Sequence, residues 1–248
     1  MLNIVIPMAG RGSRFQDAGY AFPKPLIEIR GKTMIEIVIN NLKPKDEHKF
    51  IFICQKEHYE KFDLYNVLKN ATDNKFEVIQ IDGVTEGAAC TVLTSQKYIN
   101  NNDELLIANS DQFIETNIND FLKTGRKHEH DGMIMTFPSS HPKWSYARTD
   151  ENGLVIEVAE KKVISNKATV GIYYFKNGCD FVKAAQHMIE KNIRFNNEFY
   201  VCPTYNELIL ENKKIGVYDI DIEQMHGLGT PEDLNIFLKK LDEGKINI

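Results

Sequence analysis

The chain has 248 residues and a net charge of −5, with 42% hydrophobic and 26% charged residues. This is the composition of a globular protein with one large α/β domain or two modest ones. The negative charge argues against general nucleic-acid binding, and no apolar run approaches the roughly 18–20 residues of a membrane-spanning helix.

The first expected element is a buried strand, because Leu2–Pro7 (LNIVIP) is short, apolar and β-branched. The next is a helix over residues 33–42, where Thr33 is the N-cap and Glu36 completes a capping box. The connection between them spans about twenty residues, against the roughly 2–6 of an ordinary strand–helix loop. A loop of this length in a compact domain is usually functional, and the flanking apolar runs argue against disorder.

Strands and helices continue to alternate over the first half of the chain. Strands are expected at 50–54, 76–81, 104–108 and 132–137, and helices at 57–70, 87–98 and 118–126. This alternation predicts an α/β fold with a mostly parallel sheet and helices on both faces.

Extended segments with turns replace this pattern after residue 138. Strands are expected at 145–149, 155–160 and 169–175, as a β-rich insertion packed over the carboxyl-terminal edge of the sheet, followed by helices at 179–191 and 203–211 and a strand at 215–220. The last helix is expected to begin with Thr230 as N-cap and Pro231 at the first helical position. No linker or repeat interrupts the chain, so residues 1–248 are expected to form a single domain.

The four cysteines, Cys54, Cys90, Cys179 and Cys202, are widely separated and form no Cys-x-x-Cys pair, so reduced thiols are expected. The segment MLNIVIPMAG has no basic leader and leads directly into the first strand. Together these features predict a cytoplasmic protein.

The long loop after the first strand carries groups that bind phosphate. Gly10 and Gly12 let backbone N–H groups approach an anion closely. Arg11 and Arg14 add bidentate donors, and Lys24 is a fixed cation between two prolines. In a doubly wound sheet this loop lies beyond the carboxyl end of its strand, where ligands bind. The loop therefore predicts a triphosphate site, with a solvated surface loop as the alternative.

Two other phosphate-binding loops do not fit this segment. The dinucleotide pattern GxGxxG needs a third glycine where the chain has Phe15, and Cys54 and Gln55 stand where an acidic residue would bind ribose. The P-loop pattern GxxxxGK[ST] is absent.

Asp111 follows an apolar strand directly, which places a carboxylate at the carboxyl edge of the sheet. A carboxylate there is suited to Mg²⁺ that bridges a triphosphate. The alternative role for Asp111 is to cap the following turn.

Several segments together resemble one family. PMAGRGSRF (7–15) and FPKPLIEIRGK (22–32) are similar to the G-x-G-[ST]-R … K-P motif of nucleotidyltransferases that make NDP-sugars and related activated metabolites. IANSDQF (107–113) resembles the family's metal-aspartate segment, VAEKK (158–162) its acceptor-binding segment, and GLGTPEDL (227–234) its C-terminal turn and helix. The resemblance covers essentially the whole chain. It implies a Rossmann-like sheet with an inserted β-rich acceptor lobe, and the Mg²⁺-dependent reaction NTP + phosphorylated acceptor → NDP-acceptor + pyrophosphate.

The resemblance also implies roles for individual residues. Arg14, Lys24 and Lys161 would be catalytic, with Lys161 on the acceptor's phosphate, and Asp111 would bind the metal. The nucleotide would be bound by Met8, Ala9, Gly10, Arg11, Gly12, Ser13, Gly87, Ala88 and Ser110, and the acceptor by Tyr146, Glu160, Lys161, Gly171 and Glu198. Trp144, Ser145, Thr169, Val170, Phe199 and Tyr200 are further candidates for the acceptor wall. No general base is needed, because the acceptor's phosphate attacks the α-phosphorus in line.

Alternative roles remain open for several of these residues. Gly87 and Ala88 would equally allow close helix–sheet packing, and Glu160 with Lys161 would equally form a solvated pair at a strand end. Each wall residue taken alone fits core or rim packing. Gly227 stands where the resemblance places a second metal aspartate, and Asp219 and Asp221, which lie upstream, are the alternatives for that role.

The resemblance divides the domain into a nucleotide-binding half (1–137), an acceptor-binding lobe with the return to the sheet (138–230) and a C-terminal helix (231–248). The expected partners are a nucleoside triphosphate and a phosphorylated small molecule, without nucleic acid or membrane. Formation of a homo-oligomer is left open.

The nucleotide and the acceptor are inferred from finer similarities. GAAC (87–90) and the short loop between Arg14 and Lys24 resemble the small cytidylyltransferases. Residues 140–148 and 158–175 resemble bacterial capsule-pathway members such as the CTP:phosphoglutamine cytidylyltransferases. A hexose- or heptose-1-phosphate nucleotidyltransferase is the alternative within this chemistry. A metal-dependent glycosyltransferase, which usually has D-x-D where this chain has Asn109-Ser110-Asp111, and a non-catalytic nucleotide sensor are alternatives of other classes.

Overall fold

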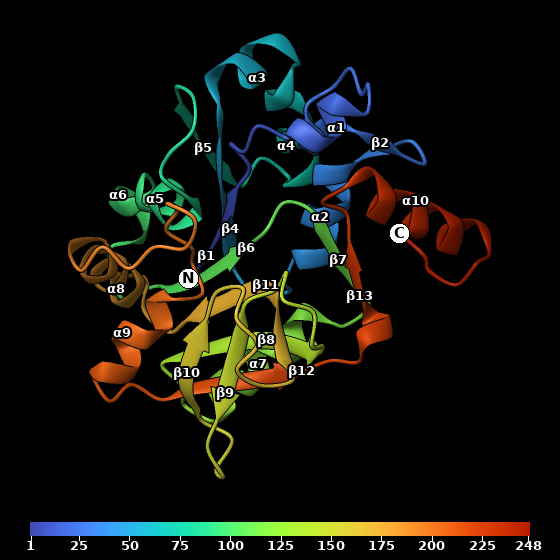
Figure 1. Ribbon diagram of the computed structural model, residues 1–248. Helices are drawn as coiled ribbons and strands as arrows, with labels where there is room; N and C mark the ends of the chain where they lie inside the picture. The colour runs from blue at the N-terminus through green and yellow to red at the C-terminus, as the bar shows by residue number, and fades with distance from the viewer.

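The computed structural model describes residues 1–248 and is built around one nine-stranded sheet (Figure 1). The strands of this sheet are β1 (Leu2–Pro7), β4 (His48–Gln55), β5 (Phe76–Ile81), β6 (Glu104–Ala108), β8 (Gly132–Pro138), β9 (Tyr146–Thr149), β10 (Val155–Ala159), β11 (Lys167–Phe175) and β12 (Ile215–Asp219). Two small sheets pair β2 (Glu28–Ile29) with β3 (Lys32–Thr33), and β7 (Gln112–Ile114) with β13 (Met225–Gly227).

The helices are α1 (Ser13–Asp17), α2 (Met34–Leu42), α3 (Lys56–Lys61), α4 (Leu64–Ala71), α5 (Ala88–Leu93), α6 (Gln96–Ile99), α7 (Ile118–Lys127), α8 (Gly178–Glu190), α9 (Thr204–Leu210) and α10 (Pro231–Asp242). Lys24–Leu26 and Ile222–Gln224 form short 3-10 helices. No helix has the length and apolar character required to cross a bilayer.

The large sheet has helices on both faces, as the sequence predicts. Ile4 and Ile6 of β1 lie in one buried cluster with side chains of α2, α4 and α7, whereas Val5 lies in another with side chains of α5, α8 and α9. In Figure 1 the second group of helices lies on the left and α2 on the right. A strand covered on both faces is apolar at successive positions, which explains its continuous hydrophobic run.

The sheet order is β10-β9-β11-β6-β1-β4-β5, and β8 pairs with both β11 and β12. β1 is parallel to β4 and β6, and β4 is parallel to β5. β11 runs antiparallel to β6, β8 and β9. The strands expected for the β-rich insertion are present, but they do not pack over the edge of the sheet: β11 pairs with β6, so they extend the same sheet.

Two helices expected to be continuous are each divided. The segment expected at 57–70 breaks between α3 and α4, where Asp63 has a φ of 48° and accepts a hydrogen bond from Asn66 at 2.8 Å. Aspartate tolerates this left-handed conformation because its short side chain bonds locally. The segment expected at 87–98 is divided into α5 and α6 around Thr94 and Ser95.

The long loop after β1 is folded and joins the C-terminal helix. It contains α1, the 3-10 helix at Lys24–Leu26 and the β2–β3 pair, none of which the sequence predicted. Phe15 and Ile27 from the loop share a buried cluster with Leu234 and Phe237 of α10. This packing brings the segment 227–234 next to the loop, although about two hundred residues separate them in the sequence.

Two helix starts expected from the sequence are confirmed. Thr33 and Glu36 form the capping box of α2, and Thr230 accepts a hydrogen bond from the backbone N–H of Asp233 at the start of α10. All four cysteines are free, as expected.

Candidate active site

The loops after β1 and β6 lie at the carboxyl edge of the parallel strands. β4 and β5 lie on one side of β1 and β6 lies on the other, so the strand order reverses between β1 and β6. Ligands of open α/β sheets bind at such a reversal. Two cavities open there, of about 480 and 570 Å³. Since Asp111 lines the first and Gly87 the second, they are called here the Asp111 cavity and the Gly87 cavity.

Lys24 and Asp111 form an ion pair at one end of the Asp111 cavity. Lys24 Nζ donates to Asp111 Oδ2 at 2.7 Å, and their side chains are 20% and 25% exposed. Gly12, with a φ of 63°, allows the loop to close on Lys24, because a Cβ there would lie 3.3 Å from Lys24 Cβ. Arg14 of α1 lines the same cavity and forms no ion pair. Its guanidinium is therefore available to an anionic ligand.

The surroundings of Asp111 fit a Mg²⁺ ion held by one carboxylate and by ligand oxygens. Gly229 leaves the carboxylate open, because a Cβ there would lie 2.9 Å from Asp111 Oδ2. No group of three or more metal-binding side chains is present, but Mg²⁺ commonly uses one or two carboxylates together with substrate phosphates. Gly227 also lines the cavity, and a Cβ there would lie 3.8 Å from Asp233 Oδ2.

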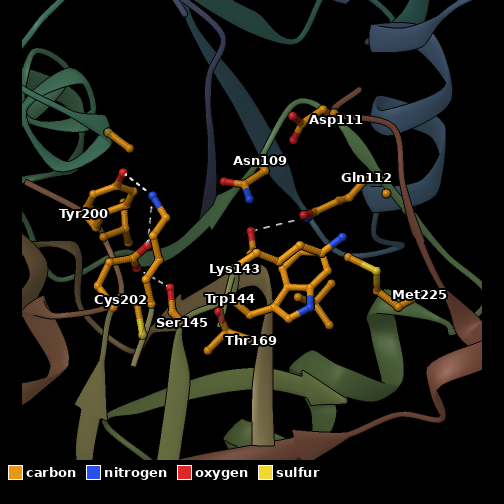
Figure 2. A pocket seen from close by; sticks show the side chains of 18 of the residues that line it. Asn109, Asp111, Gln112, Lys143, Trp144, Ser145, Thr169, Tyr200, Cys202 and Met225 are labelled. Atoms are coloured by element: carbon orange, nitrogen blue, oxygen red, sulfur yellow. Dashed lines mark hydrogen bonds and ion pairs between the residues drawn. The ribbon is translucent and has the colours of Figure 1, made fainter. Parts of the chain in front are cut away.

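Glu160 and Lys161 line the Asp111 cavity beside Ser145 and Tyr200, which lie away from Asp111 in Figure 2. Glu160 accepts a hydrogen bond from the Ser145 hydroxyl, and its side chain is 7% exposed. Lys161 Nζ lies 4.0 Å from Glu160 Oε1, donates to the Tyr200 hydroxyl at 2.8 Å, and lies 4.7 Å from the centre of that ring. The ammonium is therefore held by a hydroxyl and an aromatic face and keeps donors for a ligand.

Burial raises the pKa of Glu160 above its ordinary value of 4.5, against the opposing effects of the Ser145 hydroxyl and Lys161. Burial also raises the pKa of the neighbouring Cys202 thiol. Cys202 is therefore a neutral thiol near neutral pH and offers no thiolate nucleophile. The cavity contains cations and polar groups suited to binding anions, with no activated nucleophile of its own.

Glu160→Gln is expected to stabilise the folded protein near pH 8 and to lose this advantage as the pH falls. The pKa of Glu160 is higher in the folded protein than in the unfolded chain, where it is 4.5. The contribution of this carboxyl to stability is therefore complete below the pKa of the unfolded chain, and it is lost as the pH rises through the pKa of the folded protein. The neutral amide has no such loss. Urea unfolding of both proteins between about pH 4.5 and pH 8 measures the difference. A difference that is constant over this range would contradict the raised pKa.

The Gly87 cavity has a wall made by two loops in close contact. Gly87 has a φ of 119°, and a Cβ there would lie 2.5 Å from the carbonyl oxygen of Phe199. The Ala89 N–H donates to that oxygen at 3.0 Å, and the Phe199 N–H donates to the Glu86 carbonyl at 2.7 Å. Ala88 and Tyr200 line both cavities, so the cavities adjoin along this wall.

Most residues named by the sequence resemblance lie at these cavities. Arg14, Ala88, Asp111, Glu160, Lys161 and Gly171 line the Asp111 cavity, and Ala9, Gly10, Arg11, Gly87, Ala88 and Glu198 line the Gly87 cavity. Lys24 and Gly12 join the first through the contacts described above. Trp144, Ser145, Thr169, Val170 and Tyr200 also line the Asp111 cavity.

Besides Lys24 and Gly12, five of the named residues line neither cavity, and one of them is the buried Phe199. The Met8 side chain is buried in the core, and Ser110 is buried as well. Tyr146 is fully buried, and its hydroxyl donates to the His141 carbonyl at 2.7 Å. Ser13 is exposed at the start of α1. Tyr146 is therefore part of the core in this structure and has no surface on the expected acceptor wall.

The structure adds residues that the sequence did not indicate. Asn109 and Gln112 flank Asp111, and Lys143, Met225 and Asp233 reach the same cavity from distant segments. The side-chain oxygen of Gln112 is buried and has no hydrogen-bond donor in the protein. The position of Asn109 and Gln112 beside a carboxylate at a strand end is the one signal that would have identified them.

Comparisons with known proteins find similar sequences and structures over most of the chain. The family model described as Nucleotidyl transferase matches residues 4–234. The bifunctional protein GlmU of Buchnera aphidicola is 26% identical over 258 residues, which cover 99% of this chain and 52% of that protein. The chain thus spans about half the length of the curated relatives it matches.

Solved structures resemble the fold over almost its whole length. The nucleoside-diphosphate-sugar pyrophosphorylase from Vibrio cholerae RC9 has a TM-score of 0.80 and 27% identity, with 95% of this chain and 99% of that chain covered. The inositol-1-phosphate CTP transferase from T. maritima has a TM-score of 0.74 and 14% identity, with 98% and 96% covered. The second likeness is one of fold alone.

Proposed function

Because the chain belongs to the nucleotidyl transferase family, we propose that it joins a nucleoside triphosphate to a phosphorylated small molecule and releases pyrophosphate. The observation that carries this proposal is the Asp111 cavity, which has Arg14 and the Lys24–Asp111 pair at one end and Glu160 with Lys161 at the other. An oxygen of the acceptor's phosphate attacks the α-phosphorus, and the bond from that phosphorus to the β-phosphate oxygen breaks.

The two adjoining cavities support a division of the substrates between them. The Gly87 cavity is lined mainly by residues of the proposed nucleotide-binding half at 1–137, among them Arg11 and members of the segment 84–91, and would hold the base and ribose. The Asp111 cavity would hold the triphosphate and, beside Lys161, the acceptor, which matches the proposed acceptor lobe at 138–230.

The residues of the site would act by positioning and by charge. Lys24, Arg14 and Arg11 neutralise phosphate oxygens, and Lys161 aligns the acceptor's phosphate for attack. Asp111 would hold Mg²⁺, which when bound supplies positive charge to the triphosphate. A phosphate is already ionised near neutral pH, so no residue needs to remove a proton from the attacking oxygen.

We further propose CTP as the nucleotide, a phosphorylated metabolite such as L-glutamine phosphate as the acceptor, and a cytoplasmic role in capsule or surface polysaccharide synthesis. The support is the resemblance of residues 87–90 to the small cytidylyltransferases and of residues 140–148 and 158–175 to the capsule-pathway members. A hexose or heptose 1-phosphate is the second candidate acceptor, favoured by the sugar pyrophosphorylase among the similar structures.

Pyrophosphate release from each of the four common nucleoside triphosphates, with and without each candidate acceptor phosphate, tests the proposal. A transferase releases pyrophosphate only when nucleotide and acceptor are both present. Transfer of a sugar from a nucleotide sugar would support the glycosyltransferase alternative. Nucleotide binding without any release would support a sensor.

Lys161→Ala is expected to lower kcat/KM for the acceptor by about one to two orders of magnitude, because it removes one charge-assisted contact. The affinity for free nucleoside triphosphate, measured by calorimetry, should change by less than about threefold, since Lys161 lies at the opposite end of the cavity from the Lys24–Asp111 pair. Lys162→Ala is the matched control, because Lys162 is exposed and lines neither cavity. Weaker nucleotide binding with an unchanged acceptor KM would assign Lys161 to the nucleotide instead.

A further inference from the structure

A third cavity, of about 320 Å³, opens beside the Asp111 cavity. The two share five lining residues: Lys143, Trp144, Met225, Gly227 and Asp233. In Figure 2 Trp144 and Met225 lie on the side of the Asp111 cavity away from Asp111 and Asn109. The third cavity, called here the side compartment, therefore adjoins the proposed acceptor site.

The side compartment has an apolar lining. Phe137 and Phe237 are 3% and 1% exposed, whereas Ile222 and Ile236 are 50% and 54% exposed. The two isoleucines belong to separate segments, the 3-10 helix at Ile222–Gln224 and α10, yet they line the same cavity. A ligand seated there would remove their side chains from water, which favours an apolar ligand group.

Two lysines add positive charge to this lining. Lys143 Nζ lies 4.5 Å from the centre of the Trp144 ring, and Lys240 Nζ lies 3.4 Å from His226 Nδ1; neither ammonium is paired with a carboxylate. Burial lowers the pKa of His226, so this imidazole is the neutral form near neutral pH. The one carboxylate of the lining, Asp233, accepts a hydrogen bond from the Thr230 hydroxyl at 2.7 Å. The compartment thus offers apolar surface together with two cations that lack an anionic partner.

We propose that the side compartment binds a part of the acceptor that extends beyond its phosphorylated core, namely an apolar substituent that ends in a carboxylate. This inference rests on the proposed function, because it assigns the compartment to the same acceptor. The five shared residues place the compartment directly beside the proposed acceptor site, and Lys143 and Lys240 complement the charge of the carboxylate. A hexose phosphate without such a substituent would not fill the compartment, which would then contain water.

Binding of 3-phenylpropionate, an apolar carboxylate, tests the compartment without any enzymatic reaction. Ligand-observed NMR titration should show saturable binding to the wild-type chain, weakened about tenfold in Ile236→Asp and about fivefold in Lys240→Ala. Leu210→Asp and Lys239→Ala are the matched controls, because Leu210 is 70% exposed on α9 and Lys239 is 77% exposed beside Lys240. Thermal unfolding verifies that each variant is folded. No binding to the wild type, or equal weakening in the controls, would overturn the inference.

The assignment to the acceptor is tested with whichever acceptor supports pyrophosphate release. Ile236→Asp and Lys240→Ala should raise KM for that acceptor about fivefold to tenfold and leave KM for the nucleotide unchanged. An unchanged acceptor KM would overturn the assignment while the proposed function stands. If no acceptor supports release, the proposed function fails and the acceptor assignment falls with it, whereas 3-phenylpropionate binding still decides whether the compartment is a binding site.

Discussion

Asp111→Asn is expected to lower turnover by at least about three orders of magnitude while the protein remains folded. The amide has the shape of the carboxylate but not its charge, so it is a poor ligand for Mg²⁺ and a poor partner for Lys24. Stability should change by less than about 1 kcal/mol, because partly exposed ion pairs contribute little. Turnover measured over a Mg²⁺ titration, together with thermal unfolding, gives both quantities.

Asp219→Asn provides the matched control for this substitution. Asp219 forms an ion pair with Lys167 and, like Asp111, lies at the end of a strand, but it lines neither the Asp111 cavity nor the Gly87 cavity. If the loss of an aspartate–lysine ion pair were by itself the cause, turnover would fall equally in Asp111→Asn and in Asp219→Asn. A Mg²⁺ response of Asp111→Asn equal to that of the wild type would show that Asp111 is not a metal ligand.

Lys24→Ala and Arg14→Ala are each expected to lower turnover by about two to four orders of magnitude, as is typical when charge stabilisation of a transition state is lost. Lys24 is held by Asp111 and positioned by the prolines around it, so little reorganisation precedes its use. Arg14 is exposed and unpaired, so its removal should leave the unfolding temperature almost unchanged. Steady-state kinetics and thermal unfolding test both expectations.

Lys167→Ala and Arg148→Ala are the corresponding controls, because each side chain is paired with an acidic residue away from the two cavities. Their turnover should stay within about twofold of the wild-type value. Near-normal turnover in both Lys24→Ala and Arg14→Ala would contradict a triphosphate site in the long loop.

The parts of the fold that the sequence predicted depend on local patterns. Leu2–Pro7 is a continuous apolar run, and the Thr33–Glu36 capping box lies within a single turn. The division of the helix expected at 57–70 was not predicted, because the hydrophobic spacing continues across Asp63. This spacing gives no information about the backbone conformation of Asp63, which is what ends the helix.

The site was predicted where it follows a strand and missed where tertiary packing builds it. Ser145 lines the Asp111 cavity and Tyr146 is buried, because successive side chains along extended backbone point to opposite faces. Met225 begins a strand of only three residues, which is too short to show any period. Its place beside Trp144 depends on the pairing of β13 with β7, and no local signal reports that pairing.

β11 joins the two proposed halves of the chain within one sheet. The same strand pairs with β6 at Ile172–Phe175 and with β9 at Ala168, and its pairing with β8 is irregular between Thr169 and Tyr173. A rotation of β9 and β10 against β6 would break backbone hydrogen bonds of β11. One strand therefore ties the proposed acceptor half to the strand that precedes Asp111, and the proposed acceptor would bind between elements that are hydrogen-bonded into the same sheet.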